Sequence, residues 1–202
     1  MGKNSFGVEI SEAPRIFQST ETTNDGPMPR DTLQTDLPTL RTPTAEDGAA
    51  VWDLIRNCEP LDRNSLYCNL LQCDHFADTC VLADRDGEAL GWISAYIPPQ
   101  EPDTLFVWQV AVSENARGMG LAGKMLQELL DREVCADVSR LKTTITRSND
   151  ASWALFRRFA DRQDAVLKRE PHFKRDEHFE GRHDTEYMVT IGPFGALAAA
   201  AA

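Results

Sequence analysis

A strongly apolar segment, TLFVWQVAV at 104–112, leads into a polar loop and then into an amphipathic helix pattern at 121–131. The loop, SENARGMG, places Gly118 and Gly120 directly before that helix. Glycines let the backbone approach a ligand closely, and the amides at a helix start attract anions. The order of strand, glycine loop and helix therefore predicts an α/β domain with an anion-binding turn.

Strand and helix patterns alternate along the rest of the chain. Thr44 precedes a helix pattern with an apolar face, and Asp86-Gly87 joins two strands with a dipeptide suited to a tight hairpin. The order β-α-α-β-β-β-α-β-α-β-β predicts an α/β (α+β) domain with a mixed sheet. The remaining expected elements are helices at 65–74 and 151–160 and strands at 141–146, 165–169 and 185–191.

The two ends of the chain differ from this domain in composition. Residues 1–38 contain much Ser, Thr, Asn, Pro and Gly with few apolar residues, and we expect a disordered tail or an expression remnant. Residues 195–202 form a low-complexity tail. The expected domain is 39–194.

Charge and hydropathy limit the classes of partner. The formal net charge of −11 repels polyanions, so we expect no nucleic-acid partner, whereas small cationic substrates are favoured. The chain has no apolar run of about 18 residues and no signal-peptide pattern. We therefore expect a cytoplasmic protein with no membrane partner.

The cysteines and histidines match no familiar metal-binding spacing. The cysteines are odd in number and form no C-x-x-C pair, which argues against a zinc site and a complete disulfide framework. We expect no metal and mostly buried, reduced thiols. The cysteines are Cys58, Cys68, Cys73, Cys80 and Cys135, and the C-terminal histidines are His172, His178 and His183.

The loop also contains the letters G-x-G-x-x-G, which completes with Gly123. A dinucleotide site is not favoured, because five residues separate the strand from the first glycine and the next strand ends in 147–149 without a carboxylate. A phosphate-binding Walker loop is excluded because Gly123-Lys124 is followed by Met125.

The loop instead resembles the R/Q-x-x-G-x-G/A motif of the GCN5-related N-acetyltransferases (GNAT superfamily). The resemblance implies a mostly antiparallel sheet with splayed parallel central strands flanked by helices, and acetyl-CoA as co-substrate. It also implies that loop amides hold the pyrophosphate and that strand amides stabilise an oxyanion. The cofactor-binding residues so implied are Val110, Val112, Arg117, Gly118, Met119, Gly120, Leu121 and Ala122.

The segment TRSNDASWALFRRFA at 146–160 resembles the N-x-x-[AS]-x-x-[LF]-[YF] segment of the same superfamily. Asn149 stands where that group often contacts the cofactor, and it is equally suited to cap the following helix. Both roles can hold together. The resemblance implies a tyrosine that protonates the departing thiolate in this helix, but this chain has Phe156 at the corresponding place. The general acid is therefore unassigned.

Three further blocks narrow the resemblance: LDRNSLY at 61–67, FVWQV at 106–110 and GRHDTEYMV at 181–189. They are similar to the L-2,4-diaminobutyrate acetyltransferases of ectoine biosynthesis, and the likeness runs from residue 40 to about 191. This family implies a homodimer that makes N-γ-acetyl-L-2,4-diaminobutyrate. An acetyltransferase of another small amine or of a protein amine, or an acyl-CoA sensor without turnover, stays open as an alternative.

A diamine with one carboxylate requires carboxylates around its ammonium groups. Asp62 and Glu186 are the candidates, although Asp62 is equally suited to cap a helix and Glu186 to face outward from a strand. Tyr67 and Trp108 are candidate substrate walls, or ordinary core aromatics. His183 is a candidate proton relay, or a surface histidine.

The expected chemistry is direct acetyl transfer in a ternary complex. An alkylammonium group has a pKa of about 10.4, so a base must take its proton before the nitrogen attacks the thioester. Glu186 and His183 are the two candidate catalytic residues. A cysteine nucleophile is the weaker alternative because the thiols lack a neighbouring acid–base pattern.

Overall fold

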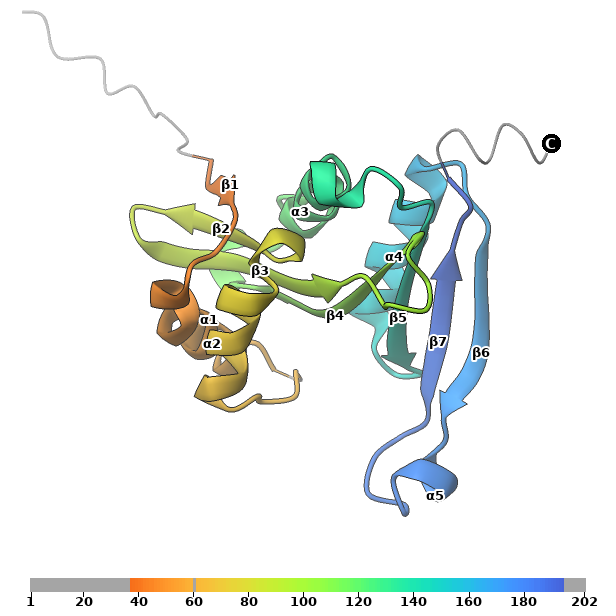
Figure 1. Ribbon diagram of the computed structural model, residues 1–202. Coiled ribbons are helices and arrows are strands. Elements are labelled where there is room, and N and C mark those ends of the chain that lie inside the picture. The colour runs from red at the N-terminus through yellow and green to blue at the C-terminus, as the bar shows by residue number, and fades with distance from the viewer. Residues whose placement is uncertain (1–36, 60, 195–202) are drawn as a thin grey trace, which may run out of the picture. The chain divides into compact units, whose positions relative to one another are not determined.

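Figure 1 shows the computed structural model of the chain, in which residues 37–59 and 61–194 are described. Within these ranges the expected order of strands and helices is confirmed except for one additional short helix before the last strand, and no helix is long and apolar enough to cross a membrane. The tails predicted at 1–38 and 195–202 lie outside the described residues, apart from Leu37 and Pro38.

Seven strands of the described part form one mixed sheet in the order β1-β2-β3-β4-β5-β7-β6, so the expected fold class is confirmed. Neighbouring strands are antiparallel except β4 and β5, which are parallel. The strands are β1 Thr39–Arg41, β2 Val81–Arg85, β3 Glu88–Tyr96, β4 Thr104–Val112, β5 Arg140–Thr146, β6 Leu167–Phe173 and β7 Glu186–Ile191. The helices are α1 Gly48–Arg56, α2 Leu66–His75, α3 Leu121–Leu130, α4 Asp150–Arg162 and α5 Arg175–His178.

The sheet packs one core on each face, because alternate residues of a strand point to opposite sides. Val81 and Ile93 belong to the core that includes α3 and α4. Their neighbours Leu82 and Trp92 belong to a second core with α1. The hairpin between β2 and β3 turns at Asp86-Gly87, where both residues have positive φ, as its sequence predicts.

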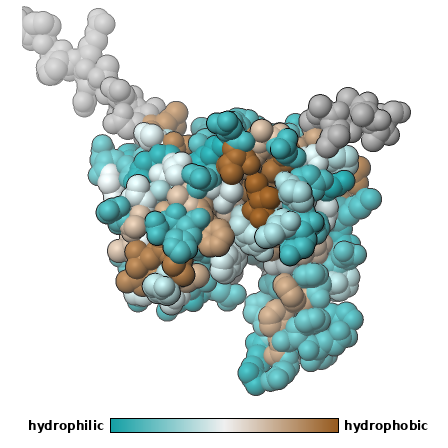
Figure 2. Space-filling view, in the orientation of Figure 1, coloured by the Kyte–Doolittle hydropathy of each residue, from teal (hydrophilic) through white to brown (hydrophobic). Residues whose placement is uncertain are grey.

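The last hairpin extends beyond the helix-covered part of the sheet. β6 is mostly exposed, and α5 lies between β6 and β7 at the lower end of Figure 1. Figure 2 shows that hydrophilic residues cover most of this end. The sequence pattern did not predict α5, and β6 runs to Phe173 rather than ending near 169.

The parallel strands β4 and β5 separate soon after they meet. Their ladder consists of the pairs Thr104–Arg140, Leu105–Leu141 and Phe106–Lys142, whereas β4 continues to Val112. The edge of β4 that faces β5 therefore has no strand partner over 107–112. Buried backbone groups need hydrogen-bond partners, so this edge is open to a ligand that supplies them.

Candidate active site

A cavity of about 560 Å³ lies where β4 and β5 separate. Its walls come from 107–110 of β4, from 143–146 of β5, from the start of α4 and from two loops. One loop, 61–64, joins α1 to α2, and the other, 181–184, precedes β7. Residues that are far apart in the sequence thus line one cavity at the gap in the sheet.

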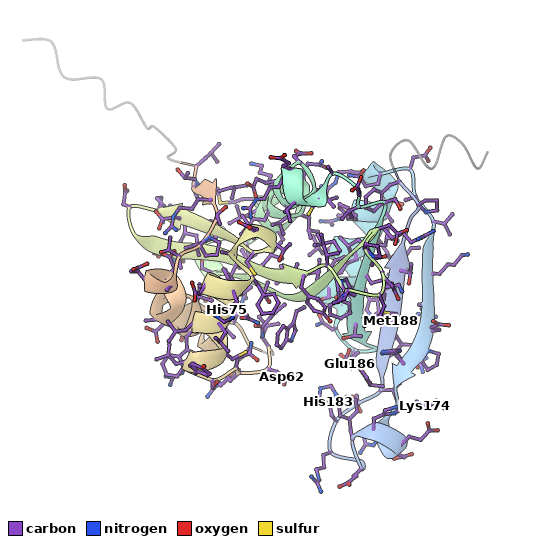
Figure 3. The ribbon with its side chains drawn as sticks, viewed as in Figure 1. Asp62, His75, Lys174, His183, Glu186 and Met188 are labelled. Atoms are coloured by element: carbon purple, nitrogen blue, oxygen red, sulfur yellow. The ribbon has the colours of Figure 1, made fainter. Side chains whose placement is uncertain are left out.

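Three titratable side chains meet in this cavity. His183 Nε2 lies 3.8 Å from a carboxylate oxygen of Asp62 and 3.9 Å from one of Glu186. The exposed fractions are 88% for Asp62, 33% for His183 and 18% for Glu186, so the depth of burial increases toward β7. Figure 3 shows Asp62 on the α1–α2 loop across from His183 and Glu186.

The environment of Glu186 favours its protonated form. Burial raises the pKa of its carboxyl group above the ordinary value, nearby His183 opposes this rise, and Asp62 adds to it. Its Oε2 atom is buried with no hydrogen-bond partner. A carboxylate held in this way accepts a proton more readily than an exposed one, as a general base must.

The helix-cap interpretation of Asp62 is not supported. Ser65 is the N-cap of α2, and its Oγ accepts a hydrogen bond from the backbone N–H of Cys68 at 3.1 Å. Trp108 lines the cavity and is 52% exposed, so it is not a core residue. Tyr67 is 69% exposed and is not among the cavity residues, so the geometry of the single chain does not place it at the site.

The glycine loop has the backbone that its sequence predicts. Gly118 and Gly120 have φ of 78° and 72°, and a Cβ at either position would meet no protein atom within 4 Å. Open space in front of a glycine turn at the N-cap of α3 fits a bound anion. Gly123 differs, because its Cβ would lie 2.6 Å from the Arg162 guanidinium, so the space in front of this glycine is filled by a side chain of α4 and is not open to a ligand.

A second cavity of about 320 Å³ is lined by Arg117 and Ala122, on either side of the glycines, and shares Val110 and Asn149 with the main cavity. Arg117 Nε donates a hydrogen bond to the backbone carbonyl of Val112 at 3.4 Å. Leu121 is buried beneath the loop, and Met119 is half-exposed outside this cavity. The predicted cofactor residues that line the second cavity are Val110, Val112, Arg117, Ala122 and Asn149.

Asn149 has both geometric features expected of it. Its Oδ1 accepts the backbone N–H of Ser152 at 3.1 Å, which caps α4, and the residue lines both cavities. Phe156 is 2% exposed and lines the main cavity without a hydroxyl group. The side chain at this place in α4 therefore offers no proton to a leaving group.

The sequence pattern missed several cavity residues. Arg175 and Arg182 line the main cavity and form ion pairs with Asp184 at 2.9 Å and Glu180 at 2.6 Å. Arg175 lies in α5 and Arg182 in the loop between α5 and β7, and the sequence of this segment has no apolar periodicity that would have predicted it. Two polar residues, Asn64 and Gln109, also line the cavity and hydrogen-bond to each other at 3.0 Å.

The thiols do not fit a nucleophile. All five cysteines are free and four are buried, as expected. Burial raises the pKa of Cys80 to about 12 and that of Cys135 to about 11, so both stay protonated at neutral pH. Among the described residues no group of three or more His, Cys, Asp or Glu side chains is arranged to hold a metal ion.

Comparison with known proteins agrees with this geometry. Residues 49–160 match the acetyltransferase (GNAT) family. The L-2,4-diaminobutyric acid acetyltransferase of Methylotuvimicrobium alcaliphilum is 52% identical over 168 residues, which cover 82% of this chain and 98% of the relative. The enzyme of the same name from Halomonas elongata is 46% identical over 156 residues, covering 77% and 81%.

A solved structure extends the comparison to three dimensions. The diaminobutyrate acetyltransferase of Paenibacillus lautus, in complex with L-2,4-diaminobutyric acid and coenzyme A, has a TM-score of 0.74 and 40% identity over 78% of this chain and 95% of that one. Ard1 of Thermoplasma volcanium, at 14% identity and a TM-score of 0.61 over 77% of this chain and 98% of that one, shares the fold alone. The chain therefore belongs to the GNAT acetyltransferase family and, within it, to the L-2,4-diaminobutyric acid acetyltransferases.

Proposed function

We propose that this protein transfers the acetyl group of acetyl-CoA to the γ-amino group of L-2,4-diaminobutyrate, forming N-γ-acetyl-L-2,4-diaminobutyrate for ectoine biosynthesis. The observation that carries this proposal is the cluster of Asp62, His183 and Glu186 in the gap between β4 and β5. Two carboxylates in one cavity match a substrate with two ammonium groups.

Acetyl-CoA supplies the thioester carbonyl, and this chain's residues would hold it by its phosphates and its arm. The amides around Gly118 and Gly120 and the N-terminus of α3 suit the diphosphate, and Arg117 adds a positive charge. Asn149 lines the path toward the main cavity. The open edge of β4 near Val110 offers backbone donors to a carbonyl oxygen.

Glu186 is the proposed general base. The Glu186 carboxylate is partly desolvated, and its Oε2 has no hydrogen-bond partner in the described structure, so it can accept a proton from an ammonium group in the cavity. Transfer of the ammonium proton to Glu186 frees the nitrogen lone pair for attack. His183 lies within 4 Å of both carboxylates, and its imidazole is placed to orient them or to carry the proton onward.

Charge also orients the diamine. Asp62 and Glu186 attract the two ammonium groups, while Arg175 and Arg182 in the same cavity are donors for the substrate carboxylate. Trp108 provides an aromatic wall, which contributes roughly 0.5–2 kcal/mol when it faces a cation. The charge pattern thus distinguishes the amino-acid end of the substrate from its γ-amine.

The direct test is release of the CoA thiol from acetyl-CoA in the presence of L-2,4-diaminobutyrate, ornithine, lysine or a histone peptide. We expect turnover to be highest with diaminobutyrate and the product to carry its acetyl group on the γ-nitrogen by NMR. A preference for the peptide, or turnover with none of the amines, would contradict the proposal.

The enzyme is further proposed to act as a homodimer in the cytoplasm. Its family resemblance supports a dimer, as do the exposed apolar side chains of α2, Leu66 and Tyr67. Sedimentation equilibrium should give twice the mass of the 22.6 kDa chain. A single species of monomer mass at assay concentrations would refute the dimer.

A further inference from the structure

A β-bulge in β4 turns one buried amide side chain toward the substrate loop. Val107 pairs with Ala95 and Gln109 pairs with Ser94, which leaves Trp108 as the extra residue. Val107 and Ala95 both pack in the core that includes α3 and α4. In a regular strand Gln109 would share that face, because residues two apart do. The bulge instead directs Gln109 to the opposite face of the sheet.

On that face Gln109 binds the loop 61–64 at two points. Its Nε2 donates to the backbone carbonyl of Asp62 at 2.9 Å, and its Oε1 accepts from Asn64 Nδ2 at 3.0 Å. The indole N–H of Trp52 donates to the Asn64 carbonyl at 3.1 Å and fixes the end of the loop. Gln109 is only 8% exposed, so these bonds form in a largely water-free setting where they direct the loop strongly.

The Asp62 side chain itself has little to hold it. It is 88% exposed, and its only ion-pair contact within 4 Å in the described part of the chain is the one to His183 at 3.8 Å. Its place over the cavity therefore depends on its backbone, which Gln109 anchors. Binding groups must be held within about 0.5 Å of their productive position by such supporting contacts.

We propose that Gln109 is a positioning residue for the diamine. By binding the backbone carbonyl of Asp62, it holds the side-chain carboxylate of Asp62 at the cavity. This inference rests on the proposed role of Asp62 in substrate binding. Gln109 acts on the Michaelis constant of the diamine. It lines the main cavity but not the second cavity, so we expect the acetyl-CoA site to stay unaffected.

The test is a double-mutant cycle with Gln109→Leu and Asp62→Asn, read as the KM for diaminobutyrate, the KM for acetyl-CoA and kcat. Gln109→Leu should raise the diamine KM about tenfold, the scale of one or two lost hydrogen bonds, with the acetyl-CoA KM unchanged. In the Asp62→Asn background the same substitution should raise the diamine KM no further.

Two companion variants separate positioning from stability. Thr79→Val removes another buried bond, from Thr79 Oγ1 to the Ala95 carbonyl at 2.7 Å, and should lower Tm without changing the diamine KM. Gln109→Met keeps the length of the side chain and adds no charge to the cavity but loses both bonds to the loop, so it should reproduce the KM effect even if Gln109→Leu does not fold.

Each outcome has a distinct meaning. If the Gln109 variants lose only Tm, as Thr79→Val does, or if their KM effect adds fully to that of Asp62→Asn, the positioning role is overturned while Asp62 keeps its own. If Asp62→Asn leaves the diamine KM unchanged, the proposed substrate role of Asp62 fails, and with it the inference about Gln109.

Discussion

Replacing Gly120 with alanine perturbs the glycine loop in two separable ways. Gly120 has φ of 72° at the N-cap of α3, a conformation that costs an L-residue about 1–2 kcal/mol. The reduced entropy of the unfolded chain returns roughly 0.4–1 kcal/mol of this. The net loss is about 1 kcal/mol, which lowers Tm by about 2–4 °C for a domain of this size.

The second effect is on the bound diphosphate. No protein atom lies within 4 Å of the position a Cβ would take, so the new methyl group enters the space in front of the loop. A displacement of about 1 Å in a bound substrate can cost as much as about a hundredfold, so we expect the acetyl-CoA KM to rise at least about tenfold. Steady-state kinetics and thermal unfolding of the same preparation measure both effects.

Gly87→Ala is the matched control. Gly87 has φ of 84° and the same open surroundings, but it lies in the β2–β3 hairpin turn and not at the N-terminus of a helix. It should lose a similar Tm with no change in the acetyl-CoA KM. Equal KM effects in both variants, or a Gly120→Ala enzyme with a normal acetyl-CoA KM, would refute the assignment of the loop to phosphate binding.

Other variants probe the loop, the fold and the helix cap. Gly123→Ala should change stability by less than about 1 kcal/mol and leave the acetyl-CoA KM unchanged, because only the mobile end of Arg162 must shift; a large KM increase would contradict this. Arg41 lowers the pKa of Asp47 through hydrogen bonds of 2.7 Å, so Asp47 stabilises the fold above its ordinary pKa of 3.8 and loses this effect as pH falls through its folded-state value. Asp47→Asn should therefore be less stable to urea at neutral pH, with the difference shrinking in acid; a constant difference would argue against the ion pair. Asn149→Ser should keep the α4 cap and Tm but raise the acetyl-CoA KM. Asn149→Ala should raise this KM and also lower the free energy of unfolding by about 1 kcal/mol, because the cap is lost; a normal KM in both variants would leave the cap as the only role of Asn149.

Local chemistry made much of the fold predictable. Apolar periodicity identified most elements, and the positive φ at Asp86-Gly87 followed from turn chemistry. The bulge at Trp108 was not predictable, because one added residue in a strand leaves the apolar pattern almost unchanged. The helix α5 has only four residues, about one turn, which is too short for an apolar periodicity, so its exposed polar sequence gave no signal.

The candidate site was predictable only in its residue types. Asp62 and Glu186 are distant in sequence, and their approach to His183 depends on the splay of β4 from β5 and on both loops. The family resemblance, rather than spacing, singled them out. Tyr67 came from the same block as Asp62, but helical geometry carries its side chain to an exposed face of α2.

Acetyl transfer by this site requires Glu186 to act as the base in the gap between β4 and β5. The most direct measurement is kcat for Glu186→Gln with diaminobutyrate across pH. We expect kcat to fall by about a hundredfold or more with an unchanged acetyl-CoA KM. The raised pKa of Glu186 predicts that wild-type kcat declines on the acid side as this carboxyl takes a proton, and the variant should lack that decline. A variant whose kcat and pH profile match those of the wild type would contradict the account.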